Sequence, residues 1–228
     1  MPINKSKIGL VIPAYNEGGA IGDVLASLRK NGYENIIVVD DGSRDNTFEV
    51  AKKSGAIVLK HGINRGLGGA LGTGIKAAVL KKYPVIVTFD ADGQHDVADI
   101  ERVSVPILQG KADVVIGSRL KNKKGMPWYR VWMNMLGNAV TYALFGIWCS
   151  DTQSGLRAFS LEAARKIQIR SNRMEVSSEI IREIKRREFT MREVPIKAIY
   201  TDYSLSKGQS LLTGIRTLFK LILHRLMN

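Results

Sequence analysis

The sequence predicts one α/β domain whose mostly parallel sheet is covered by helices on both faces. Short apolar runs alternate with longer, helix-length segments over residues 8–116. These runs are rich in Val and Ile at consecutive positions, which is typical of strands covered on both faces. The chain has 228 residues, 45% of them hydrophobic and 24% charged, which suits a folded globular chain and excludes disorder.

The first half is expected to form a series of strand–helix units. Strands are predicted at 8–12, 36–39, 57–59, 85–89 and 114–116, and helices at about 18–31, 45–54, 67–82 and 97–110. Strands joined through helices in this way are mostly parallel and connected by right-handed crossovers. Ligands of such sheets bind beyond the carboxyl ends of the strands, so the residues there are the first candidates for a functional site.

The second half follows a different pattern. It is predicted to contain a basic loop at 121–127, helices at 128–148, 160–168, 175–187 and 209–226, a polar loop at 150–155 and a strand near 192–199. The last helix carries an apolar stripe that includes Leu211, Ile215 and Ile222. The stripe is consistent with a helix packed on the core and with a helix that lies in a membrane interface.

Cysteine content and hydropathy exclude several classes of protein. Cys149 is the one cysteine of the chain, so an internal disulfide is excluded, and no Cys/His cluster indicates a zinc module. No apolar leader precedes the first predicted strand, and no run of about 18 apolar residues occurs. We therefore expect cytoplasmic synthesis without a secretory leader or a transmembrane helix.

Positive charge is concentrated in the second half. The formal net charge is +13; residues 1–118 hold 14 Lys and Arg against 13 Asp and Glu, whereas residues 119–228 hold 20 against 8. Such a surface attracts phosphates, nucleic acid or an acidic membrane, or is a solvated surface without a specific partner. Nucleic acid is disfavoured as a partner because the chain has neither a recognisable basic reading helix nor a series of stacking aromatic residues.

Polar residues follow four of the predicted strands. The segments are 13–17 (PAYNE), 40–45 (DDGSRD), 90–94 (DADGQ) and 117–119 (GSR). Each segment alone is compatible with a turn or a helix cap. Their joint occurrence at the edge where ligands bind favours a functional site.

Asp90, Asp92 and Gln94 form a candidate metal site. The two carboxylates lie two residues apart and can converge where the strand breaks at Gly93. Oxygen ligands suit Mg²⁺ or Mn²⁺, and so few of them predict an ion that also binds substrate phosphates. Such an ion can neutralise charge on a leaving diphosphate. The loop lacks the remaining ligands of an EF-hand.

A glycine-rich stretch at 64–70 (NRGLGGA) opens one of the predicted helices. Its glycines can admit an anionic ligand at the start of the helix, or they can allow close packing of the helix itself. No Gly-Lys-Ser/Thr follows, so the stretch is not a Walker loop, and the dinucleotide-binding pattern is incomplete.

Taken together, these strand ends resemble those of the family 2 glycosyltransferases, which have the GT-A fold. The resemblance is carried by segments 11–17 (VIPAYNE), 38–43 (VVDDGS), 89–95 (FDADGQH), 117–119 (GSR) and 151–157 (DTQSGLR). Within the family, the sequence is most similar to dolichyl-phosphate (polyprenyl-phosphate) mannosyltransferases and related glucosyltransferases. The likeness covers about residues 8–160 and weakens after them.

The resemblance implies roles for individual residues. The nucleotide of the donor is expected to contact Pro13, Tyr15, Glu17, Asp41 and Asp90. The metal is expected at Asp90, Asp92 and Gln94, and catalysis is assigned to Asp92, Arg119 and Asp151. The acceptor phosphate is expected to contact Arg119, Arg130, Arg157 and Lys207.

The resemblance also implies a reaction: inverting transfer of mannose or glucose from GDP-mannose or UDP-glucose to a polyprenyl (dolichyl) phosphate. A phosphate monoester is already anionic at neutral pH, so it needs positioning by Arg more than deprotonation. Two alternatives stay open. One is transfer to a hydroxyl of a glycan, for which Asp151 is the candidate general base. The other is a catalytically silent module that binds nucleotide sugars.

Near its end the sequence departs from this pattern. Many relatives carry an arginine and a Gly-x-Ser-Lys run, whereas residues 200–209 read YTDYSLSKGQ, where Lys207 is the remaining candidate cation. The C-terminal transmembrane helices of some relatives are also absent. We therefore expect peripheral contact with the cytoplasmic face of the membrane through residues 128–148 and 209–226, or through a membrane-protein partner.

The predicted organisation is one catalytic domain with an amphipathic extension. Residues 1–200 are expected to form the GT-A domain, with a nucleotide-sugar half at 1–118 and an acceptor half at 119–200. Residues 201–228 are expected to form an amphipathic helix that associates with the membrane.

Overall fold

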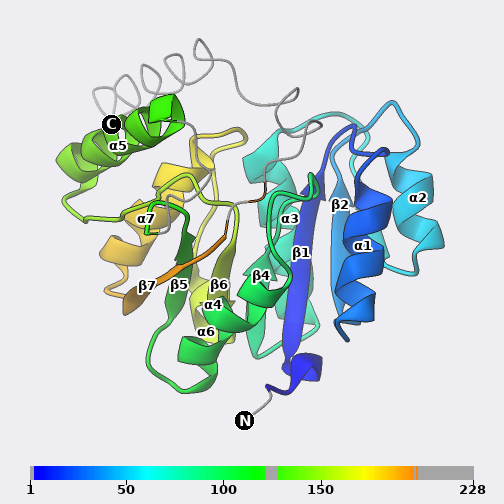
Figure 1. The fold of residues 1–228 in the computed structure, drawn as a ribbon, viewed down its shortest axis with the longest axis horizontal. Helices are drawn as coiled ribbons and strands as arrows, with labels where there is room; N and C mark the ends of the chain where they lie inside the picture. Colours follow the sequence, from blue (N-terminus) through cyan, green and yellow to red (C-terminus); the bar gives the residue numbers. More distant parts are fainter. Residues whose placement is uncertain (1–2, 122–127, 198, 200–228) are drawn as a thin grey trace.

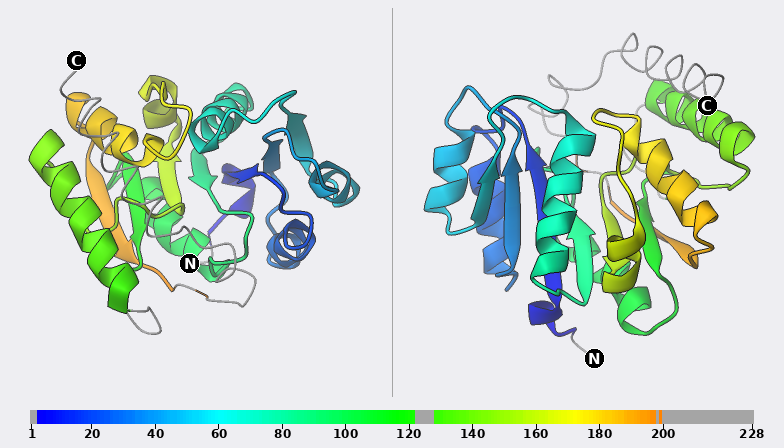
Figure 2. Two further views of the ribbon diagram at one scale, coloured as in Figure 1. Left: turned by 90° about the horizontal axis from the view of Figure 1, so that it is seen from above. Right: turned by 180° about the vertical axis from the view of Figure 1, so that it is seen from behind.

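The computed structural model describes residues 3–121, 128–197 and 199 of the chain. These residues form three layers, a central sheet with helices on each face (Figures 1 and 2). The predicted α/β class and the mostly parallel sheet are thus confirmed.

The elements alternate as predicted through the first half of the chain. The strands are β1 (Ile8–Ala14), β2 (Ile36–Asp40), β3 (Ile57–Lys60), β4 (Val85–Thr88), β5 (Val114–Ser118), β6 (Arg157–Ser160) and β7 (Met191–Pro195). The helices are α1 (Ile21–Lys30), α2 (Thr47–Lys53), α3 (Leu67–Leu80), α4 (Ala98–Leu108), α5 (Trp128–Phe145), α6 (Leu161–Lys166) and α7 (Val176–Arg186), with a short 3-10 helix, η1 (Lys5–Lys7), before β1.

The sheet has the strand order β3-β2-β1-β4-β6-β5-β7. Strand β6 pairs antiparallel with both β4 and β5, whereas the other neighbouring strands pair in parallel. The parallel strands run upward in Figure 1, so β1, β2, β4 and β5 end at the upper edge of the sheet. The segments that the sequence singled out therefore meet at one edge.

Two apolar layers explain why the strands read as continuous apolar runs. On β1, Leu10 and Ile12 pack among residues of α1 and α4, while Val11 between them packs among residues of α3, α6 and α7. Side chains alternate between the two faces of a strand, so a strand covered on both faces needs an apolar residue at every position. Strand β3 differs: it lies at the edge of the sheet, and Ile57 is 40% exposed.

Strand β6 is the main departure from the predicted elements. Its four residues, 157–160 (RAFS), follow a polar loop and contain no long apolar run, so the sequence gives no clear strand signal there. The strand near 192–199 is present as β7 and ends at Pro195. The predicted helix at 209–226 and most of the basic loop at 121–127 lie outside the described residues. Within the described part, no helix is both long and apolar enough to span a membrane.

Candidate active site

The acidic segment after β4 lies at the centre of the carboxyl edge. His95 Nε2 lies 2.9 Å from Asp90 Oδ2, and His95 itself is buried. Burial alone would raise the pKa of Asp90, but the hydrogen bond with His95 and the charges of His95, Arg119 and Arg157 hold this pKa below its ordinary value. Asp90 is therefore ionised at neutral pH.

Asp92 has the opposite shift. Burial and the negative charge of Asp90 raise the pKa of Asp92 to about 6, although the backbone N–H of Gln94 lowers it in part. Gln94 donates to both oxygens of Asp92, from its backbone N at 3.0 Å and from Nε2 at 2.8 Å. Gln94 thus orients Asp92, and its predicted role as a metal ligand stays a prediction.

These two carboxylates fit a hard divalent cation. They are close enough for the charge of Asp90 to oppose ionisation of Asp92, and a cation would remove that repulsion. No group of three or more His, Cys, Asp or Glu side chains that could hold an ion gathers among the described residues. A metal at Asp90 and Asp92 would therefore complete its coordination with amide, water or substrate oxygens.

Gly155 makes room for Asp90. A Cβ atom at Gly155 would lie 2.1 Å from Asp90 Oδ2 and 2.2 Å from Oδ1. The Gly155 carbonyl also accepts a 2.7 Å hydrogen bond from Thr88 Oγ1, on the last residue of β4. The loop before β6 is thus fixed directly against the acidic segment, and a side chain at position 155 would displace the Asp90 carboxylate.

The loops after β1 and β2 are tied to each other. Asn16 has a positive φ of 54°; its backbone N donates to Ser43 Oγ, and its Oδ1 accepts from the Arg44 N–H. The Glu17 N–H donates to Thr47 Oγ1 at 2.8 Å. Two predicted nucleotide contacts flank this link: Tyr15 is 43% exposed and Pro13 is half-buried. Hydrogen bonds therefore hold the loops after β1 and β2 together at the carboxyl edge of the sheet.

Asp41 directly follows β2 and is buried. Its Oδ1 lies 2.6 Å from His61 Nδ1 and accepts from the Arg65 N–H at 2.9 Å, while its Oδ2 accepts from the Gly66 N–H at 2.7 Å. Asp41 thus holds the glycine-rich stretch in place. Its predicted contact with the nucleotide stays a prediction.

The glycine-rich stretch packs against protein. A Cβ atom at Gly68 would lie 1.8 Å from the Ser171 carbonyl oxygen, and one at Gly66 would lie 2.4 Å from that of Asn172. The Gly69 N–H donates to the same Asn172 carbonyl at 3.2 Å. Of the two interpretations of this stretch, the structure favours close packing, because the segment at 171–172 covers the start of α3.

Arg119 and Asp151 form a two-point ion pair. Arg119 Nε donates to Asp151 Oδ2 and Arg119 Nη2 to Oδ1, both at 2.8 Å, and the Arg119 backbone N–H adds a third bond at 3.0 Å. The Asp151 side chain is fully buried, whereas that of Arg119 is 19% exposed. Asp151 therefore fixes the plane of a guanidinium that reaches the surface of the site.

The remaining predicted cations have different positions. Arg157 is buried, with 2% exposure, and donates to the Thr152 carbonyl at 2.9 Å. Its predicted contact with an acceptor phosphate stays a prediction; in this structure the charge of Arg157 lowers the pKa of Asp90. Arg130 lies on α5, and the position of its side chain is not described; Lys207 lies outside the described residues.

For two residues of the site, the sequence predicted no individual role. His95 belongs to segment 89–95, and its spacing of five residues from Asp90 is the one local signal of its role. Gly155 was read as part of a polar loop, and nothing local marks it, because the need for glycine comes from Asp90, which is distant in sequence.

Comparison with known proteins identifies the family of the chain. The family model described as Glycosyl transferase family 2 matches residues 10–168. An uncharacterized protein of Methanocaldococcus jannaschii is 52% identical over 98% of this chain and 94% of its own length. The UDP-N-acetylglucosamine–dolichyl-phosphate N-acetylglucosaminyltransferase of Methanococcus voltae is 39% identical over 96% of both chains. A dolichyl-phosphate hexose transferase of Haloferax volcanii is 31% identical over 83% of this chain and 81% of its own.

Solved structures show the same fold. A crystal structure of glucosyl-3-phosphoglycerate synthase from Mycobacterium tuberculosis, in complex with Mn²⁺, UDP-glucose and phosphoglyceric acid, matches with a TM-score of 0.74. The match covers 96% of this chain and 79% of that one at 21% identity, so it shows the fold alone. With the family model spanning most of the chain, the conclusion is that this protein belongs to glycosyl transferase family 2 and is a glycosyltransferase of the GT-A fold.

Proposed function

We propose that the protein transfers a sugar from a nucleotide diphosphate sugar to a polyprenyl (dolichyl) phosphate. The transfer inverts the anomeric carbon and depends on Mg²⁺ or Mn²⁺. The protein acts as a peripheral protein at the cytoplasmic face of the membrane, alone or with a membrane-protein partner. Residues 1–118 supply the donor site, residues 119–200 supply the acceptor site, and residues 201–228 add a membrane-associated helix.

The ion pair between Arg119 and Asp151 is the observation that supports a phosphate acceptor. A hydroxyl acceptor must lose a proton to a general base within hydrogen-bond reach. Asp151 is the candidate base, but it is fully buried and both of its oxygens accept from Arg119. A phosphate acceptor needs no such base, and an oriented guanidinium matches its oxygens. This geometry supports a lipid phosphate over a glycan hydroxyl.

The donor site is assigned to the other strand ends. Asp90 and Asp92 would hold the divalent cation, which when bound neutralises charge on the leaving nucleotide diphosphate. His95 keeps Asp90 ionised and Gln94 orients Asp92. The base and ribose of the nucleotide are assigned to Pro13, Tyr15, Glu17 and Asp41.

The names of the relatives support an order in which to test the candidate sugars. The relative that matches over nearly its full length and 96% of this chain is named for UDP-N-acetylglucosamine. Relatives named for mannose or hexose transfer match at 29–31% identity over 70–83% of this chain. We therefore place N-acetylglucosamine first among the donors to be tested, ahead of the mannose and glucose that the sequence alone favoured.

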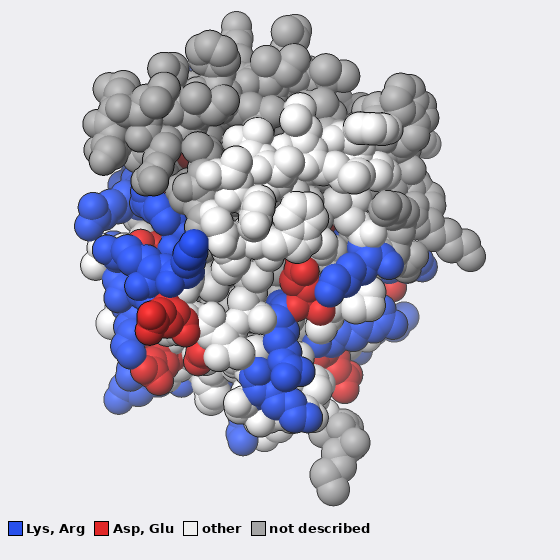
Figure 3. Space-filling model, turned by 90° about the vertical axis from the view of Figure 1, so that its left-hand side faces the viewer, with Lys and Arg blue, Asp and Glu red and all other residues white. Residues whose placement is uncertain are grey.

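The exposed surface of helix α5 is consistent with the proposed contact with a membrane. Its outer face is apolar and exposed: Trp132 is 68% exposed, Leu136 51% and Met135 48%. Its inner face holds the buried polar residues Asn138 and Thr141. This arrangement is the reverse of a helix on a water-exposed surface and fits an interface with lipid. Figure 3 shows uncharged surface on this side of the molecule, with Lys and Arg side chains beside it.

A transfer assay with organic extraction tests the proposal. The protein is mixed with Mg²⁺ or Mn²⁺, a polyprenyl phosphate in detergent, and labelled UDP-N-acetylglucosamine, UDP-glucose or GDP-mannose in separate tubes. We expect label in the organic phase only when metal and lipid are both present, and the active tube identifies the sugar. Label on added glycans instead would assign the acceptor to a hydroxyl. Donor binding without transfer in every tube would favour the silent module.

A matched pair of variants tests the metal site. Asp92→Asn should lower metal-dependent transfer by at least about 10²-fold, because it removes charge that would hold the ion beside the leaving diphosphate. Asp96→Asn is the control, since Asp96 lies four residues further on and accepts from the Ala98 N–H at the start of α4. Full metal-dependent transfer by the Asp92 variant would contradict the assigned role.

A further inference from the structure

The loop that carries Asp151 is held by two side chains from elements outside every motif discussed above. One is Glu193 on β7, and the other is Asn138 on α5. Glu193 lies 43 residues after Ser150 in the sequence, and Asn138 lies 12 residues before it. Only the tertiary fold brings them to this loop.

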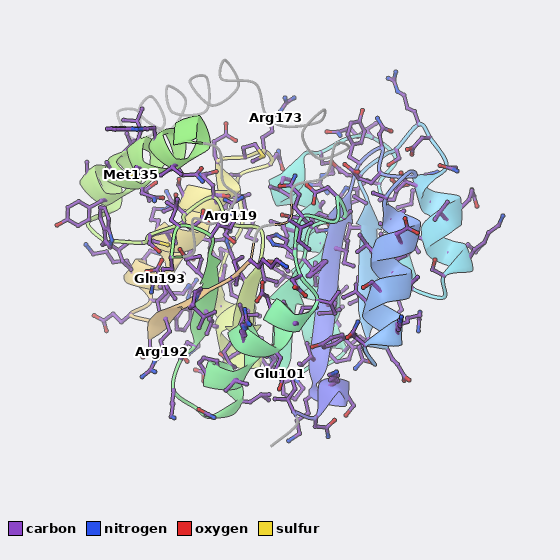
Figure 4. The ribbon with its side chains drawn as sticks, in the orientation of Figure 1. Glu101, Arg119, Met135, Arg173, Arg192 and Glu193 are labelled. Atoms are coloured by element: carbon purple, nitrogen blue, oxygen red, sulfur yellow. The ribbon has the colours of Figure 1, made fainter. Side chains whose placement is uncertain are left out.

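Glu193 binds the residue before Asp151. Its Oε1 accepts from the Ser150 N–H at 2.6 Å, from Ser150 Oγ at 2.8 Å and from Cys149 Sγ at 3.3 Å. Its other oxygen lies 3.7 Å from Lys121 Nζ, and the side chain is 13% exposed. In Figure 4, Glu193 and Arg119 both lie in the left half of the view, near β5 and β7. A single carboxylate oxygen thus fixes the backbone on one side of Asp151.

Asn138 holds both neighbours of Asp151. Its Nδ2 donates to the Ser150 carbonyl at 2.5 Å, and its Oδ1 accepts from the N–H and the Oγ1 of Thr152 at 3.0 and 2.9 Å. Asn138 is 3% exposed. Both ends of the amide are used on one loop, so the amide selects one loop conformation as well as filling space.

We propose that Glu193 and Asn138 are positioning residues that set the place of Asp151 and, through it, the plane of the Arg119 guanidinium. The inference rests on the proposed function, in which Arg119 binds the acceptor phosphate. In this proposal, both side chains act through the Asp151 loop and neither contacts a substrate directly. Each fixes a residue adjacent to Asp151, and Asp151 fixes Arg119 by three hydrogen bonds.

The burial of polar groups supports a positioning role over simple packing. An apolar side chain at either position would avoid the desolvation of a buried amide or carboxylate. The polar side chains instead supply donors and acceptors whose directions match those of the Ser150 and Thr152 backbones. Misplacement of a reacting group by about 1 Å can cost about 10²-fold in rate, so this restraint bears directly on transfer.

The variants distinguish the effect of the hydrogen bonds from the effects of side-chain charge and volume. Glu193→Gln keeps an oxygen for the Ser150 donors, whereas Glu193→Ala removes it. Asn138→Ala removes all three bonds to the loop. Asn134→Ala is the control: Asn134 lies one turn earlier on α5, and among the described residues it has no hydrogen bond to this loop.

Two readouts separate a positioning role from a structural one. For transfer, the Ala variants at 138 and 193 should lower kcat/KM for the polyprenyl phosphate by about 10–10²-fold. Their affinity for the nucleotide diphosphate, measured by calorimetry, should stay within about twofold of wild type, because the donor site is built on other strands. Glu193→Gln should recover most of the activity, and Asn134→Ala should match wild type.

Hydrogen–deuterium exchange supplies the second readout and needs no substrate. In the Ala variants we expect faster exchange confined to a peptide covering residues 149–156, with the rest of the domain folded and protected as in wild type. Parallel losses of donor affinity and transfer, no advantage of Gln over Ala at 193, or unchanged exchange at 149–156 would each overturn the inference. If wild type transfers no sugar to lipid, the proposed function fails, and exchange alone then decides whether these residues hold the loop.

Discussion

At the scale of single residues, the contact between Gly155 and Asp90 leads to a clear prediction. Gly155→Ala should lower transfer by about 10²-fold, because the new Cβ would displace the Asp90 carboxylate, from which it would lie only about 2 Å. Gly62→Ala is the control, since Gly62 has no atom within 4 Å of its would-be Cβ. Equal activity of the two variants would show that Asp90 can move without cost.

Cys149 gives a second prediction at this scale. Burial and the neighbouring Glu193 carboxylate raise the pKa of the Cys149 thiol well above its ordinary value. Because the thiolate is the reactive form, the native protein should react slowly with a thiol reagent even at pH 8–9, where an exposed cysteine reacts readily. Reaction with a chromogenic disulfide, with and without denaturant, measures this. Rapid reaction of the native protein would contradict the buried position.

At the scale of elements, the glycines of α3 differ in whether an added Cβ atom would collide with a neighbour or make an ordinary contact. Gly68→Ala should destabilise the domain by at least about 1–3 kcal/mol, because its Cβ would collide with the Ser171 carbonyl. Gly72→Ala should be neutral or stabilising by about 0.5–1 kcal/mol, since its Cβ meets Ile169 only at 3.8 Å. Thermal or denaturant unfolding compares the pair, and a stable Gly68 variant would contradict the close packing.

The outer face of α5 gives the second prediction at this scale. Trp132→Ser combined with Leu136→Ser should weaken binding to vesicles of mixed zwitterionic and anionic phospholipid by about tenfold or more, because two apolar side chains leave the interface. Leu80→Ser is the control: Leu80 is 82% exposed but ends α3, at the opposite edge of the sheet. Co-sedimentation measures binding. Equal losses of vesicle binding in both variants would contradict the proposal that the outer face of α5 contacts the membrane.

At the scale of the whole molecule, the proposed donor and acceptor halves share one sheet. Strand β5 belongs to the first half, yet it pairs only with β6 and β7 among the described strands, and both come from the second half. β6 also covers the edge of β4. The sheet therefore cannot be completed by either half alone.

This sheet order predicts how a fragment behaves. Residues 1–118 alone should be unfolded or aggregated, because β5 has no partner and β4 becomes an open edge. Because β4–β7 join the two halves in one sheet, the whole chain should unfold in a single cooperative transition. Circular dichroism and size-exclusion chromatography of the fragment check this, and a monomeric, cooperatively folded fragment would contradict it.

Much of the first half could be predicted from local pattern. Runs such as 36–39 are apolar at every position, which indicates burial on both faces, and the polar segments after them indicate the edge of the site. The four residues of β6 were missed because Arg157 and Ser160 interrupt any apolar run. The burial of Arg157 could not be predicted either, because it depends on β6 lying between β4 and β5.

The sequence by itself determined the layered α/β class, the edge of the sheet at which the candidate site lies, and the residue types of its acidic segment. These follow from the spacing of apolar residues and from residue types a few positions apart. The tertiary structure alone decided that Asp151 pairs with Arg119, that 171–172 covers the start of α3, and that Glu193 and Asn138 hold the Asp151 loop. Local periodicity encodes which side of an element is buried; the distant partner of a polar group depends on strand order and packing.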